Sequence, residues 1–284
     1  MGVSFQLDHL VIAVIDLEQA VADYLQLGFN VVPGGRHQHT PTQNALVYFA
    51  DGTYLELIEW TMPVPGEKWY EHLTQHGEGL VDFAFVPSKI GDAIAQAAER
   101  GVQYRGPIDG SRIKPTGEHV QWQLGWPVSR ALPFLCGDVT PRSLRVPDGE
   151  VRKHRNQASG ITSIAIRVDN LDDAAEAYRA LLGSESDTVL GVTRSLEAVG
   201  LDVLSIQLGS TQLHLVAPLA TEESTAGERF RSDLKRKGQG VYRLCVDGLD
   251  DAPSKQEISQ LKHGVPLLIT HKNLTLLERI DYHE

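Results

Sequence analysis

Glu56 is the residue of this chain whose surroundings most directly suggest chemistry. It lies in the stretch DGTYLELIEW (Asp51 to Trp60), which alternates in the way of a strand with one buried face. The face that carries Glu56 is otherwise large and apolar, with Tyr54, Ile58 and Trp60. Because an ionised carboxylate among apolar side chains is costly without a partner, we expect a cation or a hydrogen-bond donor beside Glu56.

His9 is the best partner for Glu56 that the sequence offers. The inner face of its own alternating stretch also carries Leu7, Val11 and Ala13. We expect His9 and Glu56 to face each other as a buried hydrogen-bonded pair, with Arg36 as the alternative partner of Glu56. The pair could also exchange protons, since burial can bring the pKa of a carboxyl group towards neutrality.

The loop PGGRHQHTPTQN (Pro33 to Asn44) is the second candidate feature. Its two adjacent glycines permit a turn and a close approach to a ligand. Arg36 offers a bidentate fork for a carboxylate or phosphate, so we predict that it anchors the substrate. His37 is a candidate base or metal ligand, and Asn44 could orient a substrate carbonyl group. The alternative is a polar surface loop with an ordinary turn.

Aromatic residues favour the first half of the chain as the ligand site. All four tryptophans lie there, at Trp60, Trp69, Trp122 and Trp126. Trp122 alternates within HVQWQLGW, so we expect it to line a cleft opposite Glu56. Together with Tyr54, which shares the face of Glu56, Trp60 and Trp122 predict a small and partly apolar ligand. Taken singly, each is more typical of a core.

Composition excludes several classes of protein. The 284 residues carry a formal net charge of -11, which argues against binding a phosphate backbone. No run of about 18 apolar residues predicts a membrane span. The N-terminus lacks the pattern of a signal peptide, and Cys136 and Cys245 stand far apart, so we expect a cytoplasmic protein without disulfides.

An internal repeat is the strongest sign of the fold. The segments His9–Gly28 and Ser163–Gly183 both read as strand, turn with a capping Asp or Asn, and helix. The pairing continues between GTYLELI from Gly52 and STQLHLV from Ser210. A second unit from Leu80 and an eroded fourth unit from Gly240 follow the same order. We therefore predict an α+β protein of tandem βαβββ units with curled mixed sheets, paired into domains at residues 1–147 and 158–284.

These segments resemble the vicinal oxygen chelate superfamily, which includes glyoxalase I, extradiol dioxygenases and bleomycin-resistance proteins. The motifs GGRH, TxN and DGTYLEL resemble its glyoxalase-like domain branch over about the first 140 residues. The resemblance implies a divalent metal ion (Zn, Ni, Mn or Fe) held by residues of the first and last strands of each unit. In the first unit these positions hold His9 and Glu56, so the resemblance implies that both bind the ion, with or without chemistry. Candidates for a third metal ligand are His37, His39 and His119.

The other units keep this ligand pattern only in part. Their first-strand and last-strand positions pair Val81 with Cys136, Ser163 with His214, and Val241 with Glu278. The resemblance therefore implies an active site in the first domain and a degenerate second domain. An extradiol site would need two histidines and a glutamate in the second domain, so this pattern disfavours a ring-cleaving dioxygenase.

Two functions follow from the resemblance and the residues. The first is a metal-dependent lyase or isomerase on a small oxygenated substrate, in which Glu56 is ligand or base and His9 a ligand. The second is a metal-free protein that sequesters a small molecule. Both predict a small-molecule partner rather than nucleic acid or membrane, and both leave a homodimer open. The sequence names neither the substrate nor the metal.

Overall fold

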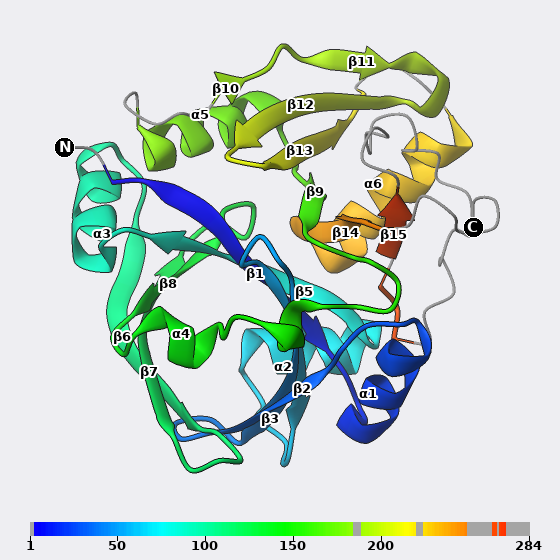
Figure 1. Cartoon of the computed structure of the whole chain (residues 1–284). Helices are drawn as coiled ribbons and strands as arrows, with labels where there is room; N and C mark the ends of the chain where they lie inside the picture. The colour runs from blue at the N-terminus through cyan, green and yellow to red at the C-terminus, as the bar shows by residue number, and fades with distance from the viewer. Residues whose placement is uncertain (1–2, 184–188, 220–223, 249–262, 266, 271–284) are drawn as a thin grey trace.

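The computed structural model describes residues 3–183, 189–219, 224–248, 263–265 and 267–270. Its first half is a closed barrel of eight strands in the order β1-β4-β3-β2-β6-β7-β8-β5 (Figure 1). The first unit consists of β1 (Phe5–Ala13), α1 (Leu17–Gln26), β2 (Val32–His37), β3 (Thr42–Tyr48) and β4 (Tyr54–Trp60). The second consists of β5 (Gly79–Pro87), α3 (Ile90–Glu99), β6 (Tyr104–Ile113), β7 (His119–Pro127) and β8 (Phe134–Asp138). Helix α2 (Lys68–His76) connects the two units.

The barrel closes because the two units pair along both of their edges. Strand β1 pairs antiparallel with β5, and β2 pairs antiparallel with β6. Within the units, β1 runs parallel to β4 and β5 runs parallel to β8. The first and last strands of each unit are thus neighbours, as the predicted α+β fold requires. Residues from both ends of a unit therefore reach the same interior.

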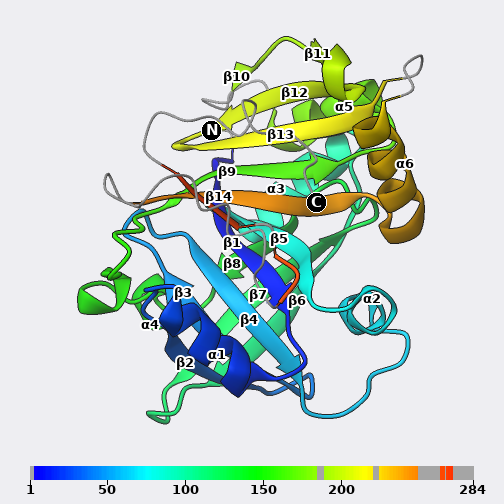
Figure 2. The ribbon, with the colours of Figure 1, turned by 90° about the vertical axis from the view of Figure 1, so that its right-hand side faces the viewer.

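A second sheet follows the barrel. It is reached through α4 (Arg142–Arg145) and a 3-10 turn, Glu150–Arg152. Its strands are β9 (Ile161–Arg167), β10 (Val189–Leu190), β11 (Arg194–Leu196), β12 (Leu201–Leu208), β13 (Thr211–Pro218), β14 (Gly240–Asp247) and β15 (Leu267–Thr270). Helices α5 (Leu171–Leu182) and α6 (Thr225–Lys237) accompany it, and a second 3-10 turn spans Glu197–Val199. Figure 2 shows this sheet stacked above the barrel.

The third and fourth units differ in how much of each pattern is described. The third unit pairs β9 parallel to β13 and β13 antiparallel to β12, as β1, β4 and β3 do in the first. Of the fourth unit, β14 and β15 are described. The helix predicted after Asp251 and the strand predicted from Asn273, with Glu278, lie outside the described residues.

Local signals set the helix ends as predicted. The Asp16 side chain accepts a hydrogen bond from the backbone N–H of Gln19 at 2.9 Å, and Asn170 accepts from Asp173 at 3.0 Å. Helix α5 ends at Gly183, whose φ of 74° suits glycine. The two equivalent helices therefore begin with the same kind of cap, which explains why the repeat is legible in the sequence.

The apolar core is continuous between the barrel and the second sheet. Buried side chains on the outer face of the barrel, such as Leu10 and Phe83, belong to one cluster with Ile164, Tyr178 and Leu213. A separate cluster fills part of the barrel interior, with Val11, Ile58, Ala84 and Phe134 among its members. The predicted division into domains at residues 147 and 158 stays a prediction. No helix of the described part has the length and hydropathy of a membrane span.

Candidate active site

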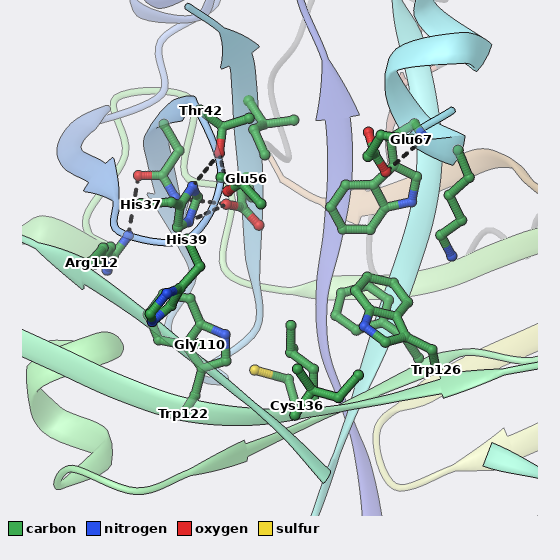
Figure 3. A pocket seen from close by; sticks show the side chains of 18 of the residues that line it. His37, His39, Thr42, Glu56, Glu67, Gly110, Arg112, Trp122, Trp126 and Cys136 are labelled. Atoms are coloured by element: carbon green, nitrogen blue, oxygen red, sulfur yellow. Dashed lines mark hydrogen bonds and ion pairs between the residues drawn. The ribbon is translucent and has the colours of Figure 1, made fainter. Parts of the chain in front are cut away.

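The barrel interior holds a cavity of about 780 Å³. Polar side chains gather on the strands of the first unit and on β6, where the wall includes His9, His37, Asn44, Glu56, Ser111 and Arg112. Across the cavity the wall is mainly aromatic and apolar, with Trp69, Trp122, Trp126 and Phe134. Figure 3 shows His37 and Glu56 on one side and Trp126 with Cys136 on another. A ligand in this cavity would therefore meet one polar and one apolar half.

Glu56 lies at the centre of the polar half. Its Oε2 is 3.5 Å from Nε2 of His9, and its Oε1 is 3.7 Å from Nε2 of His37. Asn44 Nδ2 donates a hydrogen bond of 2.6 Å to Oε1. The predicted approach of His9 and Glu56 is confirmed, and the structure adds His37 as a second imidazole. The cross-strand register places residues of β1, β2, β3 and β4 around one carboxylate.

Glu56 is ionised at neutral pH. Burial acts to raise its pKa, but His37, His9, the Asn44 hydrogen bond and Arg112 outweigh burial, so the pKa is lowered. His37 behaves differently, because burial lowers the pKa of this imidazole more than Glu56 raises it. The pKa of each group is therefore lowered, that of Glu56 by its partners and that of His37 by its burial.

Asp8 orients His9 from behind. Asp8 is fully buried, and its Oδ2 lies 2.7 Å from Nδ1 of His9. Arg145 NH1 donates to the same oxygen at 2.6 Å, and Arg142 NH1 lies 2.8 Å from Oδ1. Although burial opposes ionisation, these partners hold the pKa of Asp8 far below its usual range. His9 therefore donates its Nδ1–H to Asp8, and Nε2 is the nitrogen directed at Glu56.

Strict alternation misses Asp8, because it assigns Asp8 to the outer face beside an inward His9. The ladder between β1 and β5 shifts register between Leu7 and His9, which leaves Asp8 as the extra residue of a β-bulge. The bulge buries two consecutive polar side chains. The one sign of this bulge in the sequence was a charged residue, Asp8, directly before His9 in an otherwise apolar strand.

Ring contacts fix the remaining freedom of His9 and His37. The His9 ring stacks on Tyr54 with centroids 4.5 Å apart and an interplanar angle of 13°. His37 Nδ1 lies 2.8 Å from the hydroxyl oxygen of Thr42, and its ring meets Trp122 edge-on at 5.8 Å. Both imidazoles are thus held at Nδ1, with Nε2 directed at Glu56. The predicted places of Tyr54 and Trp122 in the cavity wall are borne out, and Trp60 also lines it.

Arg112, rather than Arg36, is the arginine of the cavity wall. Arg36 is exposed and does not line the cavity, so the prediction that it anchors the substrate there is wrong. The reason is alternation along β2, since His37 points inward and its neighbour outward. His37 pairs across the ladder with Arg112 of β6, which puts both on the inner face. Arg112 NH1 donates to Asn44 Oδ1 at 3.3 Å.

The glycine pair of the GGRH motif makes room for these side chains. The segment predicted as a loop continues as strand through His37, with a register shift between Pro33 and Gly35. A Cβ on Gly34 would stand 2.0 Å from Asn44 Oδ1 and 2.7 Å from Arg112 NH1. Gly35 has a φ of +115°, which disfavours other residues. The glycines of the motif thus leave space for the Asn44 amide group, which donates a hydrogen bond to Glu56.

The donors around Glu56 suit a divalent cation in kind and direction. No group of three or more His, Cys, Asp or Glu among the described residues already surrounds a metal-sized point. However, ligands about 2.1 Å from a tetrahedral ion lie roughly 3.4 Å apart, close to the separations of 3.5 and 3.7 Å around Glu56. Metal-binding histidines usually donate their second nitrogen to an acceptor, as His9 does to Asp8. His9, His37 and Glu56 are therefore the residues that fit a metal ion.

The other candidate ligands lie elsewhere. His39 is exposed at the cavity wall, with Nε2 3.4 Å from the Ser111 hydroxyl. His119 is exposed on β7 and does not line the cavity. In the second sheet, His214 is fully buried, and its Nδ1 lies 2.9 Å from the hydroxyl of Ser205. Cys136 lines the cavity, where burial raises the pKa of its thiol to about 12.

Comparison with known proteins agrees with this arrangement. The sequence model of the glyoxalase-like domain family matches residues 7–182, more than half of the chain. The chain belongs to the glyoxalase-like domain family. The predicted membership of the vicinal oxygen chelate superfamily is thereby confirmed.

Curated relatives of this glyoxalase-like protein are mitochondrial methylmalonyl-CoA epimerases. The Homo sapiens protein is 28% identical over 123 residues, which cover 39% of this chain and 65% of that protein. The Bos taurus protein is 26% identical over 123 residues, covering 39% of this chain and 66% of that protein. The chain thus spans slightly less than two thirds of the length of these relatives.

Solved structures show the same fold at low identity. A hypothetical protein from Staphylococcus aureus aligns with a TM-score of 0.63 at 13% identity, covering 87% of this chain and 93% of that one. A variant of 4-hydroxymandelate synthase from Streptomyces coelicolor aligns with a TM-score of 0.60 at 16% identity, covering 88% and 72%. Both likenesses span the barrel and the second sheet together.

Proposed function

We propose that this glyoxalase-like protein is a divalent-metal-dependent enzyme of the lyase or isomerase type that moves a proton beside a carbonyl group of a small oxygenated substrate. One observation carries the proposal. An ionised Glu56 stands between Nε2 of His9 at 3.5 Å and Nε2 of His37 at 3.7 Å, in the wall of a ligand-sized cavity. Both Nδ1 atoms are occupied by hydrogen bonds, so both Nε2 atoms point at the carboxylate, and a cation held between the three groups would stabilise this arrangement.

His9, His37 and Glu56 would hold the metal ion. When bound, a divalent ion polarises a substrate carbonyl oxygen and stabilises the negative charge that develops on it. The low pKa of Glu56 keeps the carboxylate available as ligand or base. Asn44 orients that carboxylate, and its carbonyl oxygen in turn accepts from Arg112. Asp8 and Tyr54 restrain the His9 ring.

The aromatic half of the cavity would hold the rest of the substrate. Trp126 stacks on Phe134 with centroids 4.9 Å apart, and Trp69 meets Trp126 at 5.4 Å. These rings offer an apolar surface that excludes water from the polar half. The β5–β8 pair of the second unit places apolar Ala84, rather than the predicted Val81, and the protonated Cys136 thiol where the first unit has His9 and Glu56. The proton would therefore be removed and returned on one face of the substrate.

The relatives support a reaction of this class. The curated relatives are named as methylmalonyl-CoA epimerases, and an epimerase inverts a stereocentre. Inversion by two opposed bases would require a second carboxylate facing Glu56. The described cavity wall adds two further carboxylates, but Glu67 caps the N-terminus of α2 and Asp109 accepts a hydrogen bond from Gln123 at 3.0 Å. We therefore propose isomerisation or elimination rather than epimerisation.

Metal analysis and proton exchange test the proposal together. Purified protein should retain a stoichiometric divalent metal by elemental analysis and should exchange the proton next to a carbonyl in D₂O, followed by NMR on a panel of small 2-oxo and 2-hydroxy compounds. Glu56→Gln should lose metal and exchange. Glu59→Gln is the matched control, because Glu59 lies on the outer face of β4 and accepts from Gln43 at 2.6 Å.

Metal-free sequestration of a small aromatic molecule is the second candidate, favoured by the tryptophan wall. Its result would be saturable quenching of tryptophan fluorescence by an aromatic ligand, with neither metal content nor exchange in wild type. That result would overturn the enzymatic proposal.

A further inference from the structure

Five basic side chains meet between α2 of the barrel and the end of α6, apart from the cavity of Glu56. They are His72, His76, Arg130, Arg167 and Lys237, called the basic cluster below. Figure 2 shows α2 beside the end of α6 that leads into β14. The five residues come from α2, the segment after β7, the end of β9 and the last turn of α6. Barrel and second sheet therefore both contribute.

Several contacts bring these residues together. The rings of His72 and His76 lie one helical turn apart with centroids at 4.8 Å. Arg167 Nε donates a long hydrogen bond of 3.5 Å to the carbonyl of Gly238, the residue after Lys237. Arg167 pairs with Gly240 across the β9–β14 ladder, and the Arg130 carbonyl oxygen lies 3.8 Å from where a Cβ on Gly240 would stand. The charges of Arg130, Lys237 and Arg167 all act against the protonated form of His72.

The charges of the cluster are not neutralised within the described part of the chain. No carboxylate there forms an ion pair with Arg130, Arg167 or Lys237. Asp233 attracts Lys237, but its carboxylate pairs with Arg236 at 2.6 Å. Such a concentration is notable in a chain with a net charge of -11. Unpaired like charges raise the free energy of the native state unless something compensates them.

Arg167 is the decisive member because it is buried. Its side chain is 5% exposed, and its guanidinium stacks over the Tyr242 ring at 5.0 Å. A guanidinium carries five N–H donors, of which the described residues use only Nε. His76 adds a buried Nδ1 that has no hydrogen-bond partner. Among the described residues, neither the terminal Arg167 nitrogens nor His76 Nδ1 has an acceptor, and an oxyanion would provide one.

We propose that the basic cluster binds a multiply charged oxyanion of the phosphate class. Arg167 would bind two oxygens through its planar fork, and Lys237 would supply a point charge. Arg130 would reach the anion from the exposed side. His72 and His76 would each donate through a ring N–H once protonated. The site is independent of the proposed metal chemistry at Glu56.

Proton uptake should accompany binding. Without an anion, burial and the neighbouring cations lower the pKa of His72 to about 3, and burial lowers that of His76. The groups facing them are Arg130 before β8, Arg167 of β9, and Arg236 and Lys237 of α6. A bound anion reverses the balance and favours the imidazolium forms. Affinity should therefore rise as the pH falls from about 8 to about 6.

Calorimetric titration of the full chain with inorganic pyrophosphate, and separately with ADP, tests the proposal. Wild type should bind at least one probe saturably below about 1 mM, with protons taken up when two buffers of different ionisation enthalpy are compared. Arg167→Gln should weaken binding at least about tenfold. Arg194→Gln is the control, since Arg194 is an exposed arginine of the second sheet. Tighter binding of ADP would mark a nucleotide-borne phosphate, and equal or tighter binding of pyrophosphate a free one.

A stability measurement separates binding from a structural role. If Arg167 is an uncompensated charge, Arg167→Gln raises the melting temperature without anion and removes the stabilisation by pyrophosphate. Should that variant fail to fold, Arg130→Gln changes an exposed side chain and should weaken binding as well. Equal affinities of wild type and Arg167→Gln, or no saturable heat with either probe, would overturn the proposal.

Discussion

At the scale of the residue, the site depends on one carboxylate and the groups that keep it ionised. Glu56 is buried, yet its pKa is lowered, because imidazoles, an amide and a guanidinium surround it. Behind His9, Asp8 is also buried and ionised, because Arg142 and Arg145 form ion pairs with its carboxylate. The polar half of the cavity is therefore a hydrogen-bonded network whose members are stable only together.

Asp8→Asn tests that network. The substitution removes the negative charge that buried Arg145 faces, so unfolding should require roughly 3–5 kcal/mol less free energy. The His9 ring should also lose its preference for a proton on Nδ1, visible as a change of tautomer in ¹⁵N NMR. Asp109→Asn is the control, because exposed Asp109 only accepts from Gln123. An unchanged tautomer would contradict the positioning role of Asp8.

His214 should make the protein sensitive to acid. Burial lowers the pKa of His214 to about 4 from an ordinary 6.5. Between pH 6.5 and about 4, His214 is protonated in the unfolded chain but neutral in the folded chain. The free energy of unfolding therefore decreases as the pH falls through this range. Urea unfolding at about pH 7 and about pH 4.5 should show this loss shrinking by about 2–3 kcal/mol in His214→Asn. The same loss in wild type and variant would exclude His214 as the cause.

At the scale of the element, two irregular strands bring the site together. The bulge in β1 buries Asp8 as well as His9, and the shift in β2 lets the chain pass Asn44 and Arg112 without a side chain between them. Regular strands would present alternate residues only. These irregularities convert an ordinary barrel wall into one with adjacent polar side chains.

Gly34→Ala tests the role of the glycine pair. The new methyl group would displace the Asn44 amide, so stability should fall by roughly 1–3 kcal/mol and Glu56 should lose its donor. The cost should shrink in an Asn44→Ala background, which a double-mutant cycle measures. Gly91→Ala is the control. A Cβ at Gly91 of α3 meets nothing within 4 Å, so this change should stabilise by about 0.5–1 kcal/mol.

At the scale of the whole molecule, the two repeat units of the barrel contribute different kinds of side chain to the cavity wall. The first unit contributes most of the polar residues of the cavity wall, whereas the second contributes Phe134, Trp126 and Cys136 together with polar Ser111 and Arg112 of β6. The second sheet packs on the outer face of the barrel through the continuous core. His263 adds a polar link, with Nδ1 2.8 Å from Glu78 Oε2 and Nε2 3.1 Å from Asp23 Oδ2.

His263→Ala tests how far this link holds the molecule together. Removing a ring that bridges two largely buried carboxylates should lower the free energy of unfolding by roughly 2–4 kcal/mol. Chemical denaturation followed by tryptophan fluorescence measures the change, since all four tryptophans lie in the barrel half. His119→Ala removes an exposed histidine of β7 and should have little effect. Equal stability of both variants would mean that the link contributes nothing.

The sequence by itself determined the repeat and the central pair of the site. Alternation in DGTYLELIEW and around His9, with equivalent caps at Asp16 and Asn170, carries enough information because these signals are local. First and last strands of one unit are neighbours in this fold, so His9 and Glu56 had to be close. The tryptophan-rich first half was also legible as the side with the cavity.

Only the tertiary structure decided the partners of that pair. Arg112 lies 68 residues from Asn44 and reaches it because β2 and β6 pair across the barrel seam. Arg36, adjacent to His37, points outward for the same reason of register. Asp8 is inward because a single-residue bulge reverses the side that alternation assigns. A shift of one residue exchanges the faces of a strand, and such shifts depend on the neighbouring strand rather than on the strand's own sequence.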